Sequence, residues 1–141
     1  MLADQEINEI AVRRFYQALT TGELTLADEA LAADWESFPP LRTGTGPDGW
    51  KGTITHLRGA FSELTAEIQD VVVSGDRVAV RSVTRARHTG ELLDVAGTGG
   101  EVEFRAADFH RLAGGRITQT WHLEDYFGLA RQLGLEFTRG A

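Results

Sequence analysis

The sequence predicts an α+β domain in which an antiparallel sheet wraps over helices. Apolar residues recur every three to four positions over residues 4–61, and the period changes to two over residues 66–125. Helices therefore gather at one end of the chain and strands at the other. The 141 residues, 42% of them hydrophobic, suffice for one core and are too few for two. We expect a single domain spanning residues 1–141.

The helical part contains three segments. The first covers residues 4–20, and its apolar stripe consists of Ile7, Ile10, Ala11, Phe15, Ala18 and Leu19. A short second helix fits residues 25–33. The prolines and glycines of "FPPLRTGTGPDG" then predict a long loop. Pro47 favours the first turn of a third helix, which continues to Phe61.

The strand part contains two hairpins and a closing helix. Residues 66–92 and 100–125 alternate with a period of two, and their turns are expected at Ser74-Gly75-Asp76 and at Gly114-Gly115. In "DYFGLARQLG", Asp125 is a candidate N-cap and Gly134 a stop signal. Four long strands are therefore expected, all after the third helix.

Composition excludes several classes of partner. With 14 basic and 21 acidic residues the net charge is −7, which repels nucleic acids and anionic membrane surfaces. The chain has no cysteine, so thiolate nucleophiles, disulfides and zinc–cysteine sites are excluded, and a cytoplasmic location is the default. No apolar run approaches the roughly 20 residues that a membrane helix needs. A small molecule is the expected partner.

Two apparent motifs carry little weight. Gly44, Gly46 and Gly49 match the dinucleotide-binding fingerprint, but that motif follows a buried strand in a parallel βαβ unit, and here two prolines precede it. The glycines are more typical of a loop that leads into a helix. No metal site is expected, because the spacing of the histidines does not suit metal binding; they are His56, His88, His110 and His122.

The alternation of the strands predicts which side chains face the core. On residues 76–88 the even positions share one apolar face, and the opposite face carries Arg81, Arg85 and Arg87. On residues 101–112 the inward positions include Phe104, Asp108 and His110. A single inward polar residue is usually structural, whereas several together indicate a site.

The register of the second hairpin decides whether His122 joins Asp108. The two residues share a face only if the loop between their strands has an odd length. A three-residue loop at 113–115 makes them diagonal neighbours, and one at 114–116 places them directly opposite, with about 5 Å between their Cβ atoms.

An even loop would instead make His122 a surface residue on the side of Arg105 and Arg111. That alternative is favoured by Ile117, Trp121 and Leu123, which form the more apolar face of the last strand.

Four stretches resemble one known family. They are "RRFYQALTTGEL", "GPDGWKGTITHLRGAF", "RHTGELLDVAGTGGEVEF" and "GRITQTWHLEDYFGLARQLG", and together they cover most of the chain. They are similar to SnoaL-like polyketide cyclases of the NTF2-like (ketosteroid-isomerase-like, cystatin-like) superfamily. This resemblance implies a cone of curved antiparallel sheet, or α+β barrel, packed on N-terminal helices, with an apolar cavity inside. It also implies frequent homodimers and chemistry without a metal or organic cofactor.

The resemblance also implies two catalytic positions, but with exchanged residue types. The aldol cyclases of this family carry an acid/base aspartate on the last long strand and a histidine on the strand before it. Matched through "GGRI" and "RQLG", these positions are His122 and Asp108. A neutral imidazole is a competent base near neutral pH, and a neighbouring carboxylate fixes its tautomer.

We therefore expect a cofactor-free enzyme of lyase or isomerase type that closes a ring in a polyketide-like substrate. His122 is the expected base, Asp108 orients it, and His88 or His110 donates a proton. The apolar cavity for a flat polycyclic substrate is expected to be lined by Phe15, Leu19, Trp35, Phe38, Trp50, His56, Phe61, His88 and Phe104. Epoxide opening, double-bond isomerisation, hydroxylase-like activity and ligand binding without turnover remain alternatives on the same scaffold.

Overall fold

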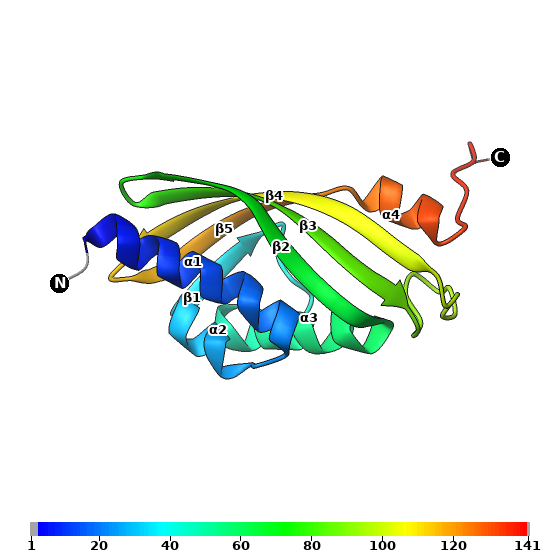
Figure 1. Cartoon of the computed structure of the whole chain (residues 1–141), viewed down its shortest axis with the longest axis horizontal. Helices are drawn as coiled ribbons and strands as arrows, with labels where there is room; N and C mark the ends of the chain where they lie inside the picture. Colours follow the sequence, from blue (N-terminus) through cyan, green and yellow to red (C-terminus); the bar gives the residue numbers. More distant parts are fainter. Residues whose placement is uncertain (1–2, 141) are drawn as a thin grey trace.

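The computed structural model describes residues 3–140 (Figure 1). Its elements in chain order are α1 (Asp4–Thr21), α2 (Thr25–Ala30), β1 (Leu31–Phe38), α3 (Gly46–Ala60), β2 (Phe61–Ser74), β3 (Arg77–His88), β4 (Glu101–Ala113), β5 (Arg116–Glu124) and α4 (Tyr126–Gln132). Among these helices, none is both long and apolar enough to cross a membrane.

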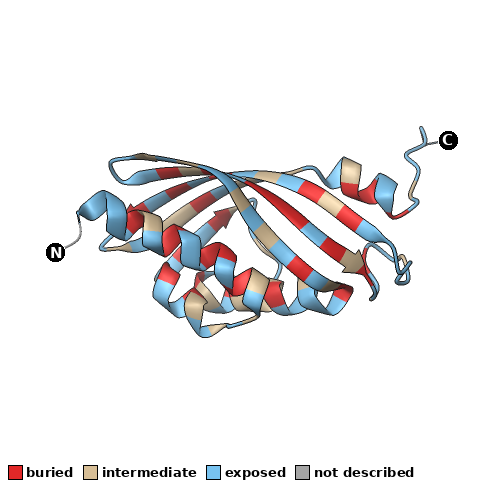
Figure 2. Ribbon diagram, in the orientation of Figure 1, coloured by how far each residue is buried: buried red, intermediate tan, exposed pale blue. Residues whose placement is uncertain are grey.

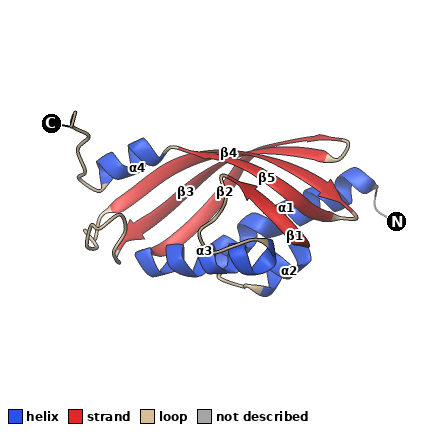
Figure 3. Cartoon of the chain, turned by 180° about the vertical axis from the view of Figure 1, so that it is seen from behind, coloured by secondary structure: helices blue, strands red, loops and turns tan. Residues whose placement is uncertain are grey.

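The strands form one curved, open sheet in the order β1-β5-β4-β3-β2. Neighbouring strands are antiparallel except β1 and β5, which are parallel. Helices α1, α2 and α3 lie together on one side of the sheet, and α4 lies beside the first part of β4 (Figures 1 and 3). The expected α+β architecture, a curved sheet over N-terminal helices, is confirmed.

Strand β1 was not expected from the sequence. A helix was predicted to reach residue 33, whereas α2 ends at Ala30 and β1 begins at Leu31. The stretch "LAADWESF" is rich in alanine and acidic residues, which are depleted in strands. Its extended form is therefore stabilised by the ladder with β5, about 85 residues later in the chain, and not by local propensity. Because β1 and β2 occupy opposite edges of the sheet, α3 does not form a parallel βαβ crossover.

Helix α1 packs against the sheet through a stripe centred on Val12, Tyr16 and Leu19. Ile7 and Ile10 were expected in this stripe but are 37% and 36% exposed, because they lie at its margins. The helix ends at Gly22, whose φ of 76° is the left-handed cap that glycine adopts without strain.

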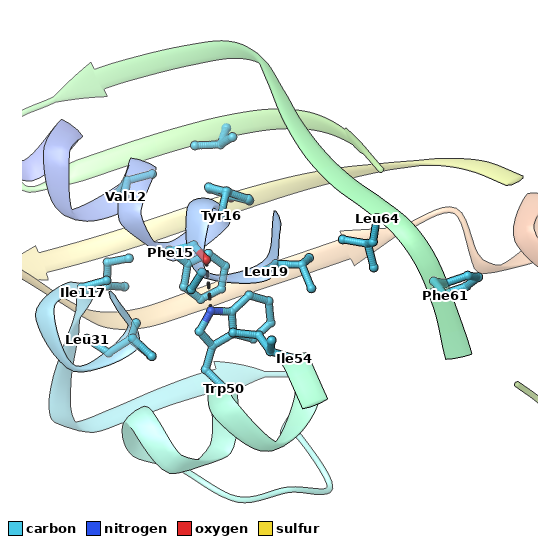
Figure 4. Packing of buried hydrophobic residues seen from close by; sticks show 14 of the residues in the cluster. Val12, Phe15, Tyr16, Leu19, Leu31, Trp50, Ile54, Phe61, Leu64 and Ile117 are labelled. Atoms are coloured by element: carbon cyan, nitrogen blue, oxygen red, sulfur yellow. Dashed lines mark hydrogen bonds between the residues drawn. The ribbon is translucent and has the colours of Figure 1, made fainter. Parts of the chain in front are cut away.

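Aromatic packing joins α3 to α1 beneath the sheet (Figure 4). The rings of Phe15 and Trp50 are stacked, with centroids 4.1 Å apart and planes 5° from parallel. The indole N–H of Trp50 donates a hydrogen bond of 3.1 Å to the backbone carbonyl of Phe15. Such a pair contributes about 0.5–1.5 kcal/mol beyond the area it buries. It fixes α3 relative to α1, and both residues line the cavity described below.

Buried and exposed residues alternate along the central strands (Figure 2). As predicted, the even positions of β3 face the helices, and Arg81 and Arg85 face solvent on the other side. In β4, Asp108 and His110 point inward together with Phe104.

The β4–β5 hairpin reaches the expected pairing by a different route. Instead of a three-residue loop, it has a two-residue turn in which Gly114 and Gly115 have φ of 59° and 76°, as a type I′ turn requires. Alone, this even loop would turn His122 outward. A β-bulge adds Thr118 between the Leu112–Ile117 and Arg111–Gln119 pairs. The extra residue restores the odd offset.

Beyond the bulge, Asp108 lies directly opposite His122. The bulge also separates the apolar residues of β5, because Ile117 is fully buried whereas Trp121 and Leu123 are 38% and 77% exposed on the opposite face.

Candidate active site

A cavity of about 460 Å³ lies between the inner face of the sheet and helices α1 and α3. Its walls are predominantly apolar. Six of the residues that were expected to line it do so: Phe15, Leu19, Trp35, Trp50, His56 and Phe104.

Three expected lining residues lie elsewhere. Phe38 pairs with Trp121 across the β1–β5 ladder and stacks on it at 5.5 Å, on the outer face of the sheet. His88 is fully buried and accepts a hydrogen bond from the backbone N–H of Thr98 at its Nδ1. Phe61 packs between His88 and Phe104, with centroids 6.0 and 5.8 Å away. His88 is therefore not placed to donate a proton to a molecule in the cavity.

Asp108 and His122 meet in the cavity wall. His122 Nδ1 lies 2.5 Å from Asp108 Oδ1. The Asp108 residue is only 2% exposed, and the side chain of His122 is 26% exposed, so the imidazole faces the cavity from in front of the carboxylate.

A chain of hydrogen bonds continues from Asp108 into the core. The Tyr16 hydroxyl lies 2.6 Å from Asp108 Oδ2 and 2.8 Å from His110 Nε2. His110 Nδ1 lies 2.8 Å from Thr120 Oγ1, which in turn accepts a hydrogen bond of 3.0 Å from the Trp35 indole. All of these residues except His122 are at least nine-tenths buried.

The two ends of this hydrogen-bonded chain, Asp108 and Trp35, determine which group donates each hydrogen bond. Because an ionised Asp108 only accepts, the Tyr16 hydroxyl donates to it and accepts from His110 Nε2–H. His110 Nδ1 then carries a lone pair, to which the Thr120 hydroxyl donates. The Trp35 N–H, which can only donate, satisfies the Thr120 oxygen.

This arrangement keeps His110 neutral. Complete burial lowers the pKa of His110, the charge of Asp108 raises it, and the charge of His122 lowers it, with a result of about 4. Burial and the neighbouring charge of Asp108 raise the pKa of Tyr16. His110 was expected as a proton donor, but its Nε2–H is used in the core by Tyr16 and its ring does not line the cavity.

His122 has the opposite electrostatic environment. Burial lowers its pKa, but the hydrogen bond to Asp108, the nearby Glu124 carboxylate and the negative charges of both outweigh burial and raise the pKa to about 10. The Glu124 carboxylate lies 3.6 Å from His122 Nε2 and also lines the cavity. Burial and Glu124 raise the pKa of Tyr126, which stands beside them at the start of α4.

Sequence reasoning missed Tyr16, Thr120, Glu124 and Tyr126. For two of them, Tyr16 and Glu124, the spacing in the sequence could have indicated the position. Tyr16 follows Val12 by four residues and so shares its face of the helix, which places a phenol opposite an inward carboxylate. Glu124 follows His122 by two residues and therefore shares its face of the strand.

Comparisons with known proteins identify the family of this chain. The family model of SnoaL-like polyketide cyclases matches residues 10–133. The chain belongs to this family. Aklanonic acid methyl ester cyclase DnrD from Streptomyces peucetius is 29% identical over 131 residues, which cover 87% of this chain and 88% of DnrD. The family and the class of enzyme expected from the sequence are thereby confirmed.

Solved structures show the same fold. IdmH from Streptomyces antibioticus, a protein proposed to be a polyketide cyclase, superposes with a TM-score of 0.79 at 30% identity over 91% of this SnoaL-like chain and 99% of IdmH. TsrD from Streptomyces laurentii superposes with a TM-score of 0.87 at 24% identity, over 94% of this chain and 98% of TsrD.

Proposed function

We propose that this SnoaL-like cyclase closes a carbon ring in a polyketide substrate by intramolecular aldol addition, with acid/base catalysis at the site that contains Asp108 and His122. The observation that carries the proposal is the hydrogen-bonded carboxylate and imidazole in the wall of an apolar cavity. A protein that only bound an apolar ligand would gain nothing from desolvating two ionisable groups there.

The reaction needs only groups that the chain supplies. One proton leaves an acidic carbon, one carbon–carbon bond forms, and one proton reaches the new alkoxide, so nothing is oxidised or reduced. A cavity that holds a flexible chain in its reactive fold contributes up to roughly 7–11 kcal/mol. Proton transfer by a positioned group adds about 10² to 10⁴ in rate. We therefore propose catalysis without a cofactor.

The cavity suits a flat polycyclic ester. Its volume of about 460 Å³ is within the usual range for small-molecule sites, and the stacked Phe15 and Trp50 rings provide apolar surface on one side. The relative DnrD is named for aklanonic acid methyl ester, so that compound is the first substrate to test.

The test compares turnover of aklanonic acid methyl ester by the wild type and two variants. We expect His122→Ala and Asp108→Asn each to lower kcat at least about tenfold with little change in substrate affinity. Glu101→Gln, on the outer face, is the matched control and should keep full activity. A wild type that binds the ester without converting it would favour a ligand-binding function, and variants that lose stability but turn over normally would show that the pair is architectural.

We also propose that the protein is a homodimer that pairs through the outer face of the sheet. Helices α1, α2 and α3 all lie on the opposite face of the sheet (Figures 1 and 3). Near its β5 side it exposes Phe109, Trp121 and Leu123, which are 61%, 38% and 77% exposed. Neighbouring apolar side chains of this size are typical of a contact with another protein surface.

A further inference from the structure

We propose that Glu124 is the catalytic base of this site and that His122, held as a cation between two carboxylates, is the acid. This reverses the role that the sequence suggested for the histidine. The inference rests on the proposed function, since it assigns the two proton-transfer steps of the same ring closure.

The imidazole of His122 lies between two carboxylates. Its two nitrogens face different carboxylates, with Nδ1 2.5 Å from Asp108 and Nε2 3.6 Å from Glu124. An imidazole whose two nitrogens both face anions is most stable with a proton on each. The pKa of about 10 agrees with this geometry. A histidine that already carries both protons cannot remove one from carbon.

Few other groups in the cavity can accept that proton. Both oxygens of Asp108 are occupied, one by His122 and the other by the Tyr16 hydroxyl. His56 is an exposed residue that lines the cavity from α3, across it from the strands β4 and β5 that carry the ion pair. Glu124 remains, with a side chain only 15% exposed and its carboxylate in the cavity wall.

The 3.6 Å separation leaves both partners available to a substrate. It is longer than a hydrogen bond, so Nε2–H can turn to a substrate oxygen while the Glu124 carboxylate faces the adjacent carbon. An enolisable ketone presents this pair of sites, a carbonyl oxygen next to an acidic C–H. Tyr126 of α4 also lies next to Glu124, and its raised pKa keeps the hydroxyl protonated. His110 lies behind Asp108 and is neutral.

The steps balance without another reactant. Glu124 removes the proton from the acidic carbon, and the enolate oxygen accepts a hydrogen bond from His122 Nε2–H. The enolate carbon attacks a second carbonyl of the same molecule, forming the new carbon–carbon bond and an alkoxide. His122 protonates the alkoxide, and Glu124 returns its proton to the imidazole. Asp108 stays ionised throughout and stabilises the cation.

The kinetic test is Glu124→Gln, which keeps the size and polarity of the side chain and removes its basicity. With aklanonic acid methyl ester we expect kcat to fall about 100-fold or more while KM stays within about threefold, as for loss of a general base. Solvent deuterium should no longer enter the acidic carbon of the substrate. Glu124→Asp should keep part of the activity, and Glu101→Gln all of it.

The charge of His122 is tested separately by nitrogen NMR of the full chain. We expect both ring nitrogens of His122 to be protonated at neutral pH in the wild type. In Glu124→Gln the pKa of His122 should fall, because one of the two anions is gone. A neutral His122 in the wild type, or a Glu124→Gln variant with wild-type turnover, would overturn the assignment of roles. Absence of turnover by the wild type would instead overturn the proposed function.

Discussion

At the residue scale, the charge of Asp108 determines the chemistry of its neighbours. The Tyr16 hydroxyl donates to one carboxylate oxygen and His122 to the other, so the negative charge is stabilised although the residue is almost fully buried. Hydrogen bonds to a charged group contribute about 1.5–3 kcal/mol each, which offsets the desolvation of the carboxylate. Tyr16 is therefore a positioning residue that acts through Asp108.

Replacing Tyr16 with phenylalanine tests this role. Tyr16→Phe leaves one Asp108 oxygen and His110 Nε2–H without partners in the core, which should lower the free energy of unfolding by about 1–3 kcal/mol. We also expect kcat to fall about tenfold with KM nearly unchanged and the NMR pKa of His122 to move. A variant that is less stable but has wild-type kcat and the same His122 pKa would limit Tyr16 to a structural role.

His122 should make stability depend on pH. Because its folded pKa of about 10 exceeds the unfolded value of 6.5, its stabilising effect is complete below pH 6.5 and is lost as pH rises toward 10. The stability difference between wild type and His122→Gln, measured by urea unfolding, should shrink over this range by at most about 1.4 kcal/mol per pH unit. A difference that does not change with pH would contradict the raised pKa.

At the element scale, local patterns fix some features and long-range pairing fixes others. The N-cap of α4 at Asp125 and the alternation of β3 and β4 follow from local chemistry, and the sequence predicted them. Strand β1 could not be predicted in this way, because its partner β5 lies far along the chain. The bulge at Thr118 was also missed, because no local residue marks it, although the pair that it aligns was predicted.

The residues of the candidate site also differ in whether local patterns or long-range contacts place them. Residue parity within β4 was enough to suggest Asp108, whereas the choice of His122 depended on the register of the hairpin and on the family resemblance. The contact of Tyr16 with Asp108 joins residues 92 positions apart, so it depends on how α1 packs across the sheet. The outward turn of Phe38 likewise depends on β1, which was itself unexpected.

The bulge gives a prediction about β5. Deleting Thr118 removes the residue that has no partner, so the pairs on both sides of it should form a regular ladder and His122 should still oppose Asp108. We expect activity within a few-fold of wild type. Deleting Arg111 from the partner strand is the matched control, because it shifts Asp108 by one position relative to His122 and should abolish activity. Inactivity of a folded Thr118 deletion would mean that the bulge has a role beyond register.

At the scale of the whole molecule, the two faces of the sheet differ in what covers them. The inner face is closed by α1 and α3 around the cavity. The outer face is crossed by arginine–glutamate pairs near β2 and β3, such as Arg85 with Glu67 and Glu103, and turns apolar toward β5. The charged part is suited to solvent. Contact with a second copy of the chain would cost the least desolvation free energy at the apolar part.

The proposed dimer is tested by Leu123→Glu. This side chain is 77% exposed and points away from the cavity, so a carboxylate there is harmless to a monomer but costly inside an apolar contact. In sedimentation velocity we expect the wild type at twice the 15.4 kDa of one chain and Leu123→Glu at the monomer mass. Val72→Glu, 59% exposed on the edge strand β2, is the matched control and should remain dimeric. A monomeric wild type, or a dimeric Leu123→Glu, would refute pairing through this face.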